Sequence, residues 1–318
     1  MRVAHTIVPT ISASSPYGKV ALGDRKPAIP RFTVEAAADC HAQFGSDVFS
    51  LLDQVGGGCF EPLAVDGSPG TPIFRPNSLV TADSIFTSSV SSGVMTVTGS
   101  VTGRALGSGM VVSGSGLTRG ATIQSQLTGT PGGAGTYQLS TNDTASASER
   151  WATSTYSGLM CPWTDQANQT TVVVFANPNI QMNAYILGDY ITGDTAAGWY
   201  LRTATNGFTQ RCAPGDQSAS ITLPSRGNGS WLCLVITEDA ASVRVKSGNL
   251  ATSASPVARV SSGRRRSIGN RALTDLTYQT GLEVAEVVHI PATVDEAEMV
   301  NLYNRAKARA ALRGIAVL

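Results

Sequence analysis

Charged side chains are scarce in this chain of 318 residues, where Asp, Glu, Lys and Arg make up 14% of the composition. A soluble domain usually carries about 25%. The 23 basic and 22 acidic residues nearly cancel, so no overall field attracts a charged partner. Because nucleic-acid binding depends on a basic surface, we expect no nucleic-acid partner.

Long apolar runs are also missing. No run approaches the ~20 residues that a membrane-spanning helix needs, so we expect no membrane span. Residues 1–9 lack the apolar stretch and the cleavage site of a secretory signal, so we expect no such signal.

Cysteine is rare, and its spacing matches no metal motif. The five cysteines include no C-x-x-C pair, so we expect no zinc site. Cys233 lies in an apolar run and is interpreted as a reduced core residue. Cys40 and Cys59 either form a disulfide or remain free thiols, and the sequence leaves both open.

Catalytic patterns are absent as well. His5, His41 and His289 are scattered along the chain, and no nucleophile motif accompanies them. Glycoside hydrolysis requires two carboxylates about 5–9.5 Å apart. Glu283 and Glu286 are three residues apart on a predicted strand, so alternation is expected to place them on opposite faces. We expect no enzymatic activity and no cofactor.

Glycine is abundant, at 33 residues, and it accompanies many Ser and Thr residues. In residues 93–140, short β-branched runs alternate with Gly/Ser turns, and Arg104 and Arg119 are the only charges. Branched side chains favour strands, and glycine permits the positive φ of tight turns. The motifs G-M-V-V-S-G at 109–114 and G-T-Y-Q-L-S at 135–140 resemble a module that recurs in phage tail-fibre and other virion proteins. This resemblance implies a virion location and says nothing of activity.

The composition changes along the chain and divides it into parts. Residues 1–31 contain four prolines and are predicted to form an extended N-terminal arm, although a disordered tail fits equally well. Residues 88–148 are predicted to be a small β module. This module is inserted into a β-sandwich made of residues 32–87 and 149–318.

Strand patterns recur in the larger part at spacings of about 8–12 residues, which is typical of a sandwich. Residues 170–176 and 229–236 are apolar runs, whereas residues 241–246 alternate with a period of two. A helix is predicted to close the chain. Residues 293–296 have the capping-box pattern with Thr293 as the cap, and Gly314 supplies the stop.

These elements resemble the C-terminal half of concanavalin A-like, laminin-G-like jelly rolls. The resemblance covers residues 170–315 and implies a mainly β jelly-roll sandwich with one short C-terminal helix. That family includes lectins, adhesion modules, glycosidases and structural domains, so it implies no single activity. Its glucanase branch carries E-x-D-x-x-E, which this sequence lacks.

Some members of that family hold calcium with loop carboxylates. Here the loop acids are isolated, no D-x-D run occurs, and the alternative is that they are ordinary solvated turn residues. We expect no metal site. The acids concerned are Asp143, Asp165, Asp189, Asp194 and Asp216.

Two clusters are candidates for carbohydrate binding. Arg264, Arg265 and Arg266 are interpreted either as a solvated loop or as a contact with an acidic polysaccharide or a neighbouring subunit. Trp199 and Tyr200 follow a glycine-rich turn and place one ring on each strand face, so an exposed ring would be available to a sugar.

The other tryptophans are assigned to packing. Trp231 lies within the most apolar strand and is predicted to fill the core. Trp151 and Trp163 flank the end of the inserted module and are predicted to pack the junction.

We therefore expect a non-enzymatic virion protein, associated with a tail fibre or baseplate, that contacts host-surface polysaccharide. Its other expected partners are virion proteins and further copies of itself. A capsid decoration or fibre-network subunit without glycan binding is the first alternative, and a polysaccharide depolymerase is the second. The sequence does not distinguish tail from head.

Overall fold

The computed structural model describes most of the chain after the predicted arm, and the arm itself (residues 1–31) lies outside the described residues. Among the described residues, no helix is both long enough and apolar enough to cross a membrane. The described residues are 35, 37–46, 51, 53, 55–56, 58–62, 64–65, 68–69, 72–154, 158–177, 184–189, 196–204, 207–212, 217–222, 229–248, 253–255, 259–269 and 281–318.

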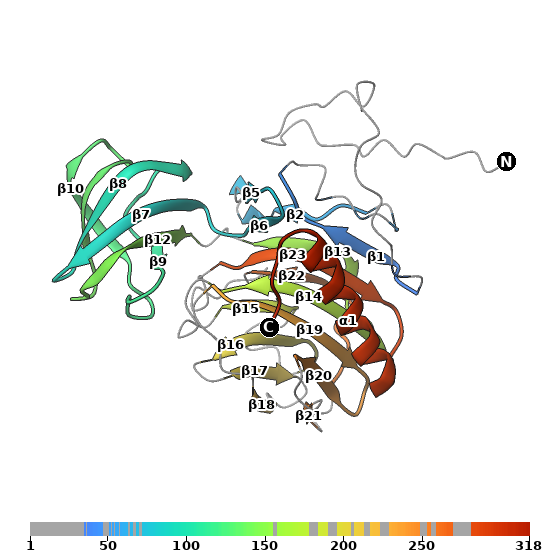
Figure 1. Ribbon diagram of the computed structural model, residues 1–318. Helices are drawn as coiled ribbons and strands as arrows, with labels where there is room; N and C mark the ends of the chain where they lie inside the picture. Colours follow the sequence, from blue (N-terminus) through green and yellow to red (C-terminus); the bar gives the residue numbers. More distant parts are fainter. Residues whose placement is uncertain are drawn as a thin grey trace.

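The chain is mainly β, and two antiparallel sheets face each other (Figure 1). The eight-stranded sheet runs in the order β21, β20, β19, β14, β23, β6, β5, with β1 also paired to β23. Their bounds are β1 Cys40–Gln43, β5 Ile73–Arg75, β6 Ser78–Val80, β14 Gln169–Ala176, β19 Trp231–Glu238, β20 Val243–Ser247, β21 Ser253–Ser255 and β23 Glu283–Ile290.

The facing sheet has seven strands in the order β18, β17, β16, β15, β22, β13, β2. Their bounds are β2 Glu61–Pro62, β13 Leu159–Thr164, β15 Tyr185–Gly188, β16 Trp199–Ala204, β17 Gly207–Cys212, β18 Gln217–Thr222 and β22 Arg265–Ile268. A short separate ladder joins β3 (Ala64–Val65) to β4 (Ser68–Pro69). The predicted jelly-roll-like sandwich is confirmed.

Strand β14 shows why the central strands are apolar throughout. Val173 and Phe175 point into the core between the sheets, whereas Val172 and Val174 lie in a second apolar cluster with helix α1 (Glu296–Leu312). Because one face is covered by the opposite sheet and the other by the helix, every residue of β14 is buried. The helix lies across the outer side of the eight-stranded sheet (Figure 1).

The ends of α1 correct one prediction and confirm another. The N-cap is Asp295, whose carboxylate accepts a hydrogen bond from the Glu298 amide at 2.8 Å, so the capping box lies two residues beyond the predicted one. Gly314, at φ 75°, ends the helix as predicted. The Ile315 and Gly314 amides donate to the carbonyls of Ala310 and Ala311, which is a Schellman motif.

A bulge in β23 overturns the expectation for its two glutamates. Glu283 pairs with Ala176 and Glu286 with Val174, although the glutamates are three positions apart in the chain and their partners only two. Both therefore lie on the helix-covered face of the sheet, and the prediction of opposite faces is wrong. The extra residue breaks the alternation on which that prediction rested.

A third, six-stranded sheet lies beside the sandwich (Figure 1). Its order is β10, β11, β8, β7, β12, β9, and its own apolar core includes Phe86, Met95 and Tyr137. The Ser92-Gly93 turn joins β7 to β8 with φ values of 47° and 78°, as a type I′ hairpin requires. The bounds are β7 Ser84–Ser91, β8 Val94–Gly103, β9 Val111–Ser113, β10 Ile123–Gly129, β11 Gly135–Leu139 and β12 Ala145–Thr153.

The strands predicted for residues 93–140 are thus present, and the sheet extends beyond them at both ends. The division of the chain into an arm, a sandwich and an inserted module at 88–148 stays a prediction.

Candidate functional site

The predicted sugar-stacking pair lies inside the sandwich. Trp199 is fully buried in the core between the sheets, and Tyr200 is 1% exposed, with its ring centroid 5.8 Å from that of Tyr185. The expectation of an exposed ring is therefore wrong. Both faces of β16 are covered at this point, which a local strand pattern does not reveal.

Trp199, and not Trp231 as predicted, is the tryptophan that is fully buried in the core. Trp231 is only partly buried at the start of β19, where it packs on the outer, helix-side cluster and forms a bridge with Val317. Trp151 packs with Val80 and Ala82 beside the six-stranded sheet, as predicted. Trp163 instead belongs to the sandwich core, where it stacks on His289 at 4.7 Å.

Arg266 brings the two predicted clusters together, but in the core. Its guanidinium lies 4.9 Å from the centroid of the Trp199 ring and makes two hydrogen bonds of 2.6 and 2.7 Å with the Glu238 carboxylate. Its Nη2 also donates to Asp165 Oδ1 at 2.6 Å. Arg266 is fully buried, so the reading of all three arginines as a solvated loop or outer contact is wrong for this residue.

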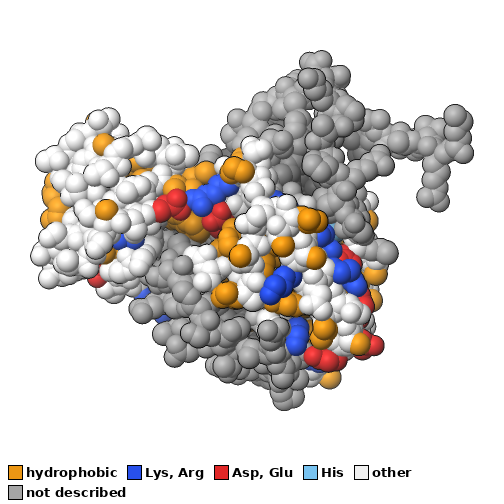
Figure 2. Space-filling model, in the orientation of Figure 1, with side chains coloured by type: hydrophobic (Ala, Val, Ile, Leu, Met, Phe, Trp, Pro, Cys, Tyr) orange, Lys and Arg blue, Asp and Glu red, His pale blue; other side chains and the backbone are white. Residues whose placement is uncertain are grey.

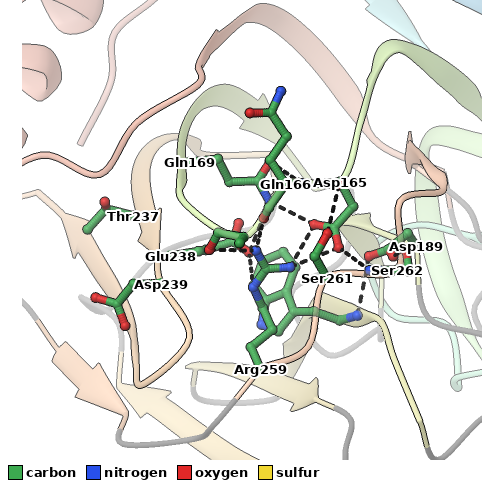
Figure 3. Close-up of polar contacts among 12 residues, drawn as sticks. Asp165, Gln166, Gln169, Asp189, Thr237, Glu238, Asp239, Arg259, Ser261 and Ser262 are labelled. Atoms are coloured by element: carbon green, nitrogen blue, oxygen red, sulfur yellow. Dashed lines mark hydrogen bonds and ion pairs between the residues drawn. The ribbon is translucent and has the colours of Figure 1, made fainter.

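Arg259 closes a ring of alternating charges by contacting the same two carboxylates as Arg266; Figure 3 shows Arg259 with Asp165 and Glu238. Its Nη1 donates to Asp165 Oδ1 and Oδ2 at 2.7 and 2.9 Å, and its Nε lies 3.1 Å from Glu238 Oε2. Two arginines and two carboxylates thus alternate with a formal charge of zero. We call Asp165, Glu238, Arg259 and Arg266 the charge ring.

The charge ring favours the ionised form of Asp165. Burial opposes ionisation of Asp165, but the positive charges of Arg266 and Arg259 outweigh it and lower the pKa of Asp165 to about 2. Burial also disfavours the charged form of Arg266, yet Glu238 and Asp165 raise its pKa further above the ordinary range. Asp165 and Arg266 therefore hold their charges across the physiological range and form a structural ion pair.

Asp189 adds a third carboxylate next to the ring. It is 5% exposed, its Oδ1 lies 4.0 Å from Arg266 Nε, and the Trp199 amide donates to the same oxygen at 3.2 Å. The Ser262 hydroxyl donates to its other oxygen (Figure 3). Burial, together with the negative charge of Asp165, raises the pKa of Asp189 to about 6.

Arg264 and Arg265 are half-buried and reach backbone carbonyls. Arg264 Nη2 donates to the Ala197 carbonyl at 2.9 Å, and Arg265 Nε donates to the Cys161 carbonyl at 2.7 Å. The Arg265 side chain is 34% exposed and pairs with Glu61 at 2.9 Å. Their predicted role in carbohydrate binding stays a prediction.

A second ionic cluster joins the first described residue to the helix. Glu35 is 7% exposed and contacts Arg309 Nη1 at 2.6 Å and Arg305 Nε at 3.0 Å. Arg309 also contacts Glu286, which in turn lies 3.0 Å from His41 Nε2. Burial opposes ionisation of Glu286, but the hydrogen bond from His41 and the charge of Arg309 lower its pKa. This cluster anchors the start of the described chain on α1.

Arg75 connects the sandwich to the six-stranded sheet. Its guanidinium lies 3.0 Å from Glu283 on β23 and 2.6 Å from Glu149 on β12. The Trp151 indole donates to the same Glu149 oxygen at 2.9 Å. Figure 2 shows a group of charged side chains among hydrophobic ones where the two parts meet.

The six-stranded sheet presents a row of hydroxyl groups across four neighbouring strands. Thr128 pairs with Thr136, Thr136 with Thr96, and Thr96 with Ser89. The first two hydroxyls are 2.8 Å apart, and all four residues are at least partly exposed. We call these four residues the hydroxyl row.

The remaining predictions concern cysteines and loop acids. Cys40 and Cys59 are free thiols in the structure, so the disulfide alternative is not realised, and Cys233 is buried as predicted. In the described part of the chain, no group of three or more His, Cys, Asp or Glu residues could hold a metal ion. Asp165 and Asp189 are buried rather than solvated, and Asp194 and Asp216 lie outside the described residues.

The fold and these contacts define a mainly β sandwich with a six-stranded β sheet beside it. No protein-family model matches the chain, and no curated protein matches it. Solved structures match in fold alone. The CBM40 of Ruminococcus gnavus IT-sialidase bound to α2,3 sialyllactose aligns over 44% of this chain and 83% of that chain, at 9% identity and a TM-score of 0.35.

Two toxin domains align over more of the chain. The botulinum neurotoxin serotype D binding domain covers 86% of this chain and 52% of that chain, at 9% identity and a TM-score of 0.42. The type G receptor binding domain covers 70% and 51%, at 14% identity and a TM-score of 0.36. No ligand of this chain follows from these alignments.

Proposed function

We propose that this chain is a non-enzymatic virion protein of a tail fibre or baseplate that contacts host-surface glycan. The observation that carries the proposal is the hydroxyl row on the six-stranded sheet. The virion location rests on the resemblance of residues 93–140 to modules of phage fibres.

The hydroxyl row suits a ligand that is itself rich in hydroxyl groups. Each Ser or Thr hydroxyl both donates and accepts a hydrogen bond. Neighbouring strands are about 4.8 Å apart, so the row offers donors and acceptors at regular intervals. The β-branched threonines have few rotamers, which reduces the entropy lost on binding.

Such contacts are individually weak, so repetition would supply the affinity. A hydrogen bond exchanged with water contributes only about 0.5–1.5 kcal/mol. Several copies on one particle would raise the overall avidity by roughly 10²–10⁴-fold if they engage one surface together. This reasoning favours a homo-oligomeric fibre component.

The state of the carboxylates supports binding without turnover. Asp165, Glu238 and Glu286 are buried and paired with arginine, and Glu283 is held by Arg75 and by the Ser78 hydroxyl. A glycosidase instead needs a carboxylic acid and a carboxylate that both face the substrate. A depolymerase therefore remains the weaker alternative.

Conservative substitutions in the hydroxyl row test the proposal. Thr96→Val with Thr136→Val keeps the branched shape and strand propensity but removes two hydroxyls. We expect at least tenfold weaker binding to polysaccharide from the host surface, with unchanged thermal unfolding. Thr164→Val, an exposed strand threonine on the seven-stranded sheet, is the matched control and should bind normally. Equal polysaccharide binding by the double variant and the control would show that the hydroxyl row does not contact the ligand.

A structural role without glycan binding is the second candidate, and the anchoring of Glu35 favours it. Glu35, which follows the predicted arm in the sequence, is held on α1 by Arg305 and Arg309. An anchored residue at this position suits a protein whose predicted arm joins neighbouring subunits in a capsid or fibre network. Gold labelling of intact particles would separate the candidates, because a head location supports this second role.

A further inference from the structure

Arg150 differs from the other buried arginines of the described chain. Arg259, Arg266 and Arg309 are each paired with two carboxylates. Arg150 is fully buried as well, but its hydrogen-bond partners are the Ser148 hydroxyl and the Ser146 carbonyl at 3.1 Å. Within the described residues no carboxylate pairs with it, and its Nε has no hydrogen-bond partner.

The neighbouring acid does not supply the missing charge. Glu149 is the next residue along β12, and alternation directs it to the opposite face. Its carboxylate is already held by Arg75 and by the Trp151 indole. A buried guanidinium without an anion is unfavourable, because burial removes water and nothing charged replaces it.

A glycine of the loop after β9 packs directly on the Arg150 side chain. A Cβ at Gly114 would come within 2.5 Å of Arg150 Cδ and 2.8 Å of its Nη1, so only glycine fits where the loop crosses this side chain. The next two loop residues, Ser115 and Gly116, are exposed, as is Ser146 on the same strand as Arg150. The Leu117 amide donates to the Gly114 carbonyl over 3.4 Å, which is a long hydrogen bond. The exposed part of this loop, residues 115–116, lies between Gly114 and the buried Leu117, so a ligand would reach the guanidinium by displacing these residues.

We propose that Arg150 forms an oxyanion-binding site that takes a carboxylate or sulfate group of a ligand. A planar guanidinium binds such a group through two parallel N–H···O bonds, and the free Nε–H is one of the donors that this geometry requires. The Ser148 hydroxyl, which already accepts a hydrogen bond from Arg150 Nη1, is a further donor for the same group. The site narrows the proposed ligand to acidic glycans and in that respect rests on the proposed function.

The test measures the arginine Nε–Hε signals of the full chain by nuclear magnetic resonance. Sodium acetate and sodium sulfate are added, with sodium chloride at matched ionic strength as the reference. We expect one signal to shift saturably with either oxyanion and not with chloride. That signal should vanish in Arg150→Met and persist in Arg104→Met, which removes an exposed arginine from the same sheet. A signal of Arg150 that ignores both oxyanions would overturn the site.

Stability supplies a second readout that does not depend on assignment. Arg150→Met removes an unpaired charge, so without oxyanion it should unfold at the same temperature as the wild type or higher. Arg266→Met breaks the charge ring and should unfold well below it. Loss of stability by Arg150→Met in chloride, as large as that of Arg266→Met, would show that Arg150 already has its counter-charge and would contradict the proposal.

Polysaccharide binding separates this inference from the proposed function. Oxyanion shifts at Arg150 without any polysaccharide binding support the site and contradict the glycan role. Acidic polysaccharide that binds at least tenfold more weakly to Arg150→Met supports both. Polysaccharide binding that is unchanged in Arg150→Met, together with an unresponsive Arg150 signal, contradicts the site alone.

Discussion

The ionisation of Asp189 makes a quantitative prediction about stability and pH. Asp189→Asn replaces a buried carboxyl group with a neutral group of the same shape. In the folded protein the pKa of Asp189 is raised to about 6 from the ordinary 3.8, because of burial and the charge of Asp165. The folded state therefore binds a proton that the unfolded state has released between about pH 4 and pH 6.

The direction in which stability changes with pH follows from this difference between the folded and unfolded pKa values of Asp189. The favourable contribution of the protonated Asp189 is fully present below about pH 4 and is lost as the pH rises through about 6. A difference of about two pH units corresponds to roughly 3 kcal/mol, at ~1.36 kcal/mol per unit. The Asn variant does not ionise, so it should match the wild type near pH 4 and exceed it by up to about 3 kcal/mol near pH 8.

Urea unfolding at several pH values measures this difference directly. Subtracting the wild-type free energy from that of the variant at each pH cancels the other titrating groups. Asp143→Asn is the control of opposite sign. Burial opposes ionisation of Asp143, but hydrogen bonds from Thr118 and Thr141 outweigh it and lower its pKa. A constant difference between Asp189→Asn and wild type from pH 4 to 8 would refute the account of Asp189.

Three further predictions concern packing and ion pairs. Trp199→Ala should lower the unfolding free energy by ~3–5 kcal/mol, because it leaves a cavity in the core and removes the ring that Arg266 contacts. Trp231→Ala should lower it clearly less, because Trp231 is only partly buried. Urea melts that rank the two variants the other way would contradict the core assignment of Trp199. Glu238→Gln should lower the unfolding free energy by ~3–5 kcal/mol, because it leaves the two buried arginines of the charge ring with one of its two carboxylates. A near-normal urea melt would show that the charge ring is not closed. Arg75→Met should lower the unfolding free energy by under about 1 kcal/mol, because the ion pairs of Arg75 are partly exposed. The substitution should nevertheless broaden the distribution of distances between fluorescent labels placed on the sandwich and on the six-stranded sheet. An unchanged distribution at low salt would show that Arg75 does not fix the orientation of these two parts.

The fold class was predictable because strand periodicity is a local property. The apolar runs at β14 and β19 and the Gly/Ser turns of residues 93–140 need only branched side chains and glycine in the right order. The helix stop at Gly314 was predictable for the same reason. The start was not, because Thr293 and Asp295 both begin a capping pattern and only the path of the chain after β23 selects Asp295.

The site was less predictable because burial depends on what covers a strand from elsewhere in the chain. Trp199 and Trp231 have similar local surroundings in sequence, but only Trp199 lies between two sheets. The Arg264–Arg266 run suggested one solvated cluster, and the pleat of β22 turns Arg266 inward towards Glu238. Arg150 carries no sequence signal at all, since the lack of a partner carboxylate appears only in three dimensions.

The central claim is that the chain binds a host-surface glycan without cleaving it. Titration calorimetry of the full chain with host polysaccharide, followed by a reducing-end assay on the same samples, tests both halves together. The account predicts heat of binding that weakens at least tenfold in Thr96→Val with Thr136→Val, and no release of reducing ends. Released reducing ends that disappear on substitution of a single Asp or Glu, or no binding heat with any host polysaccharide, would contradict it.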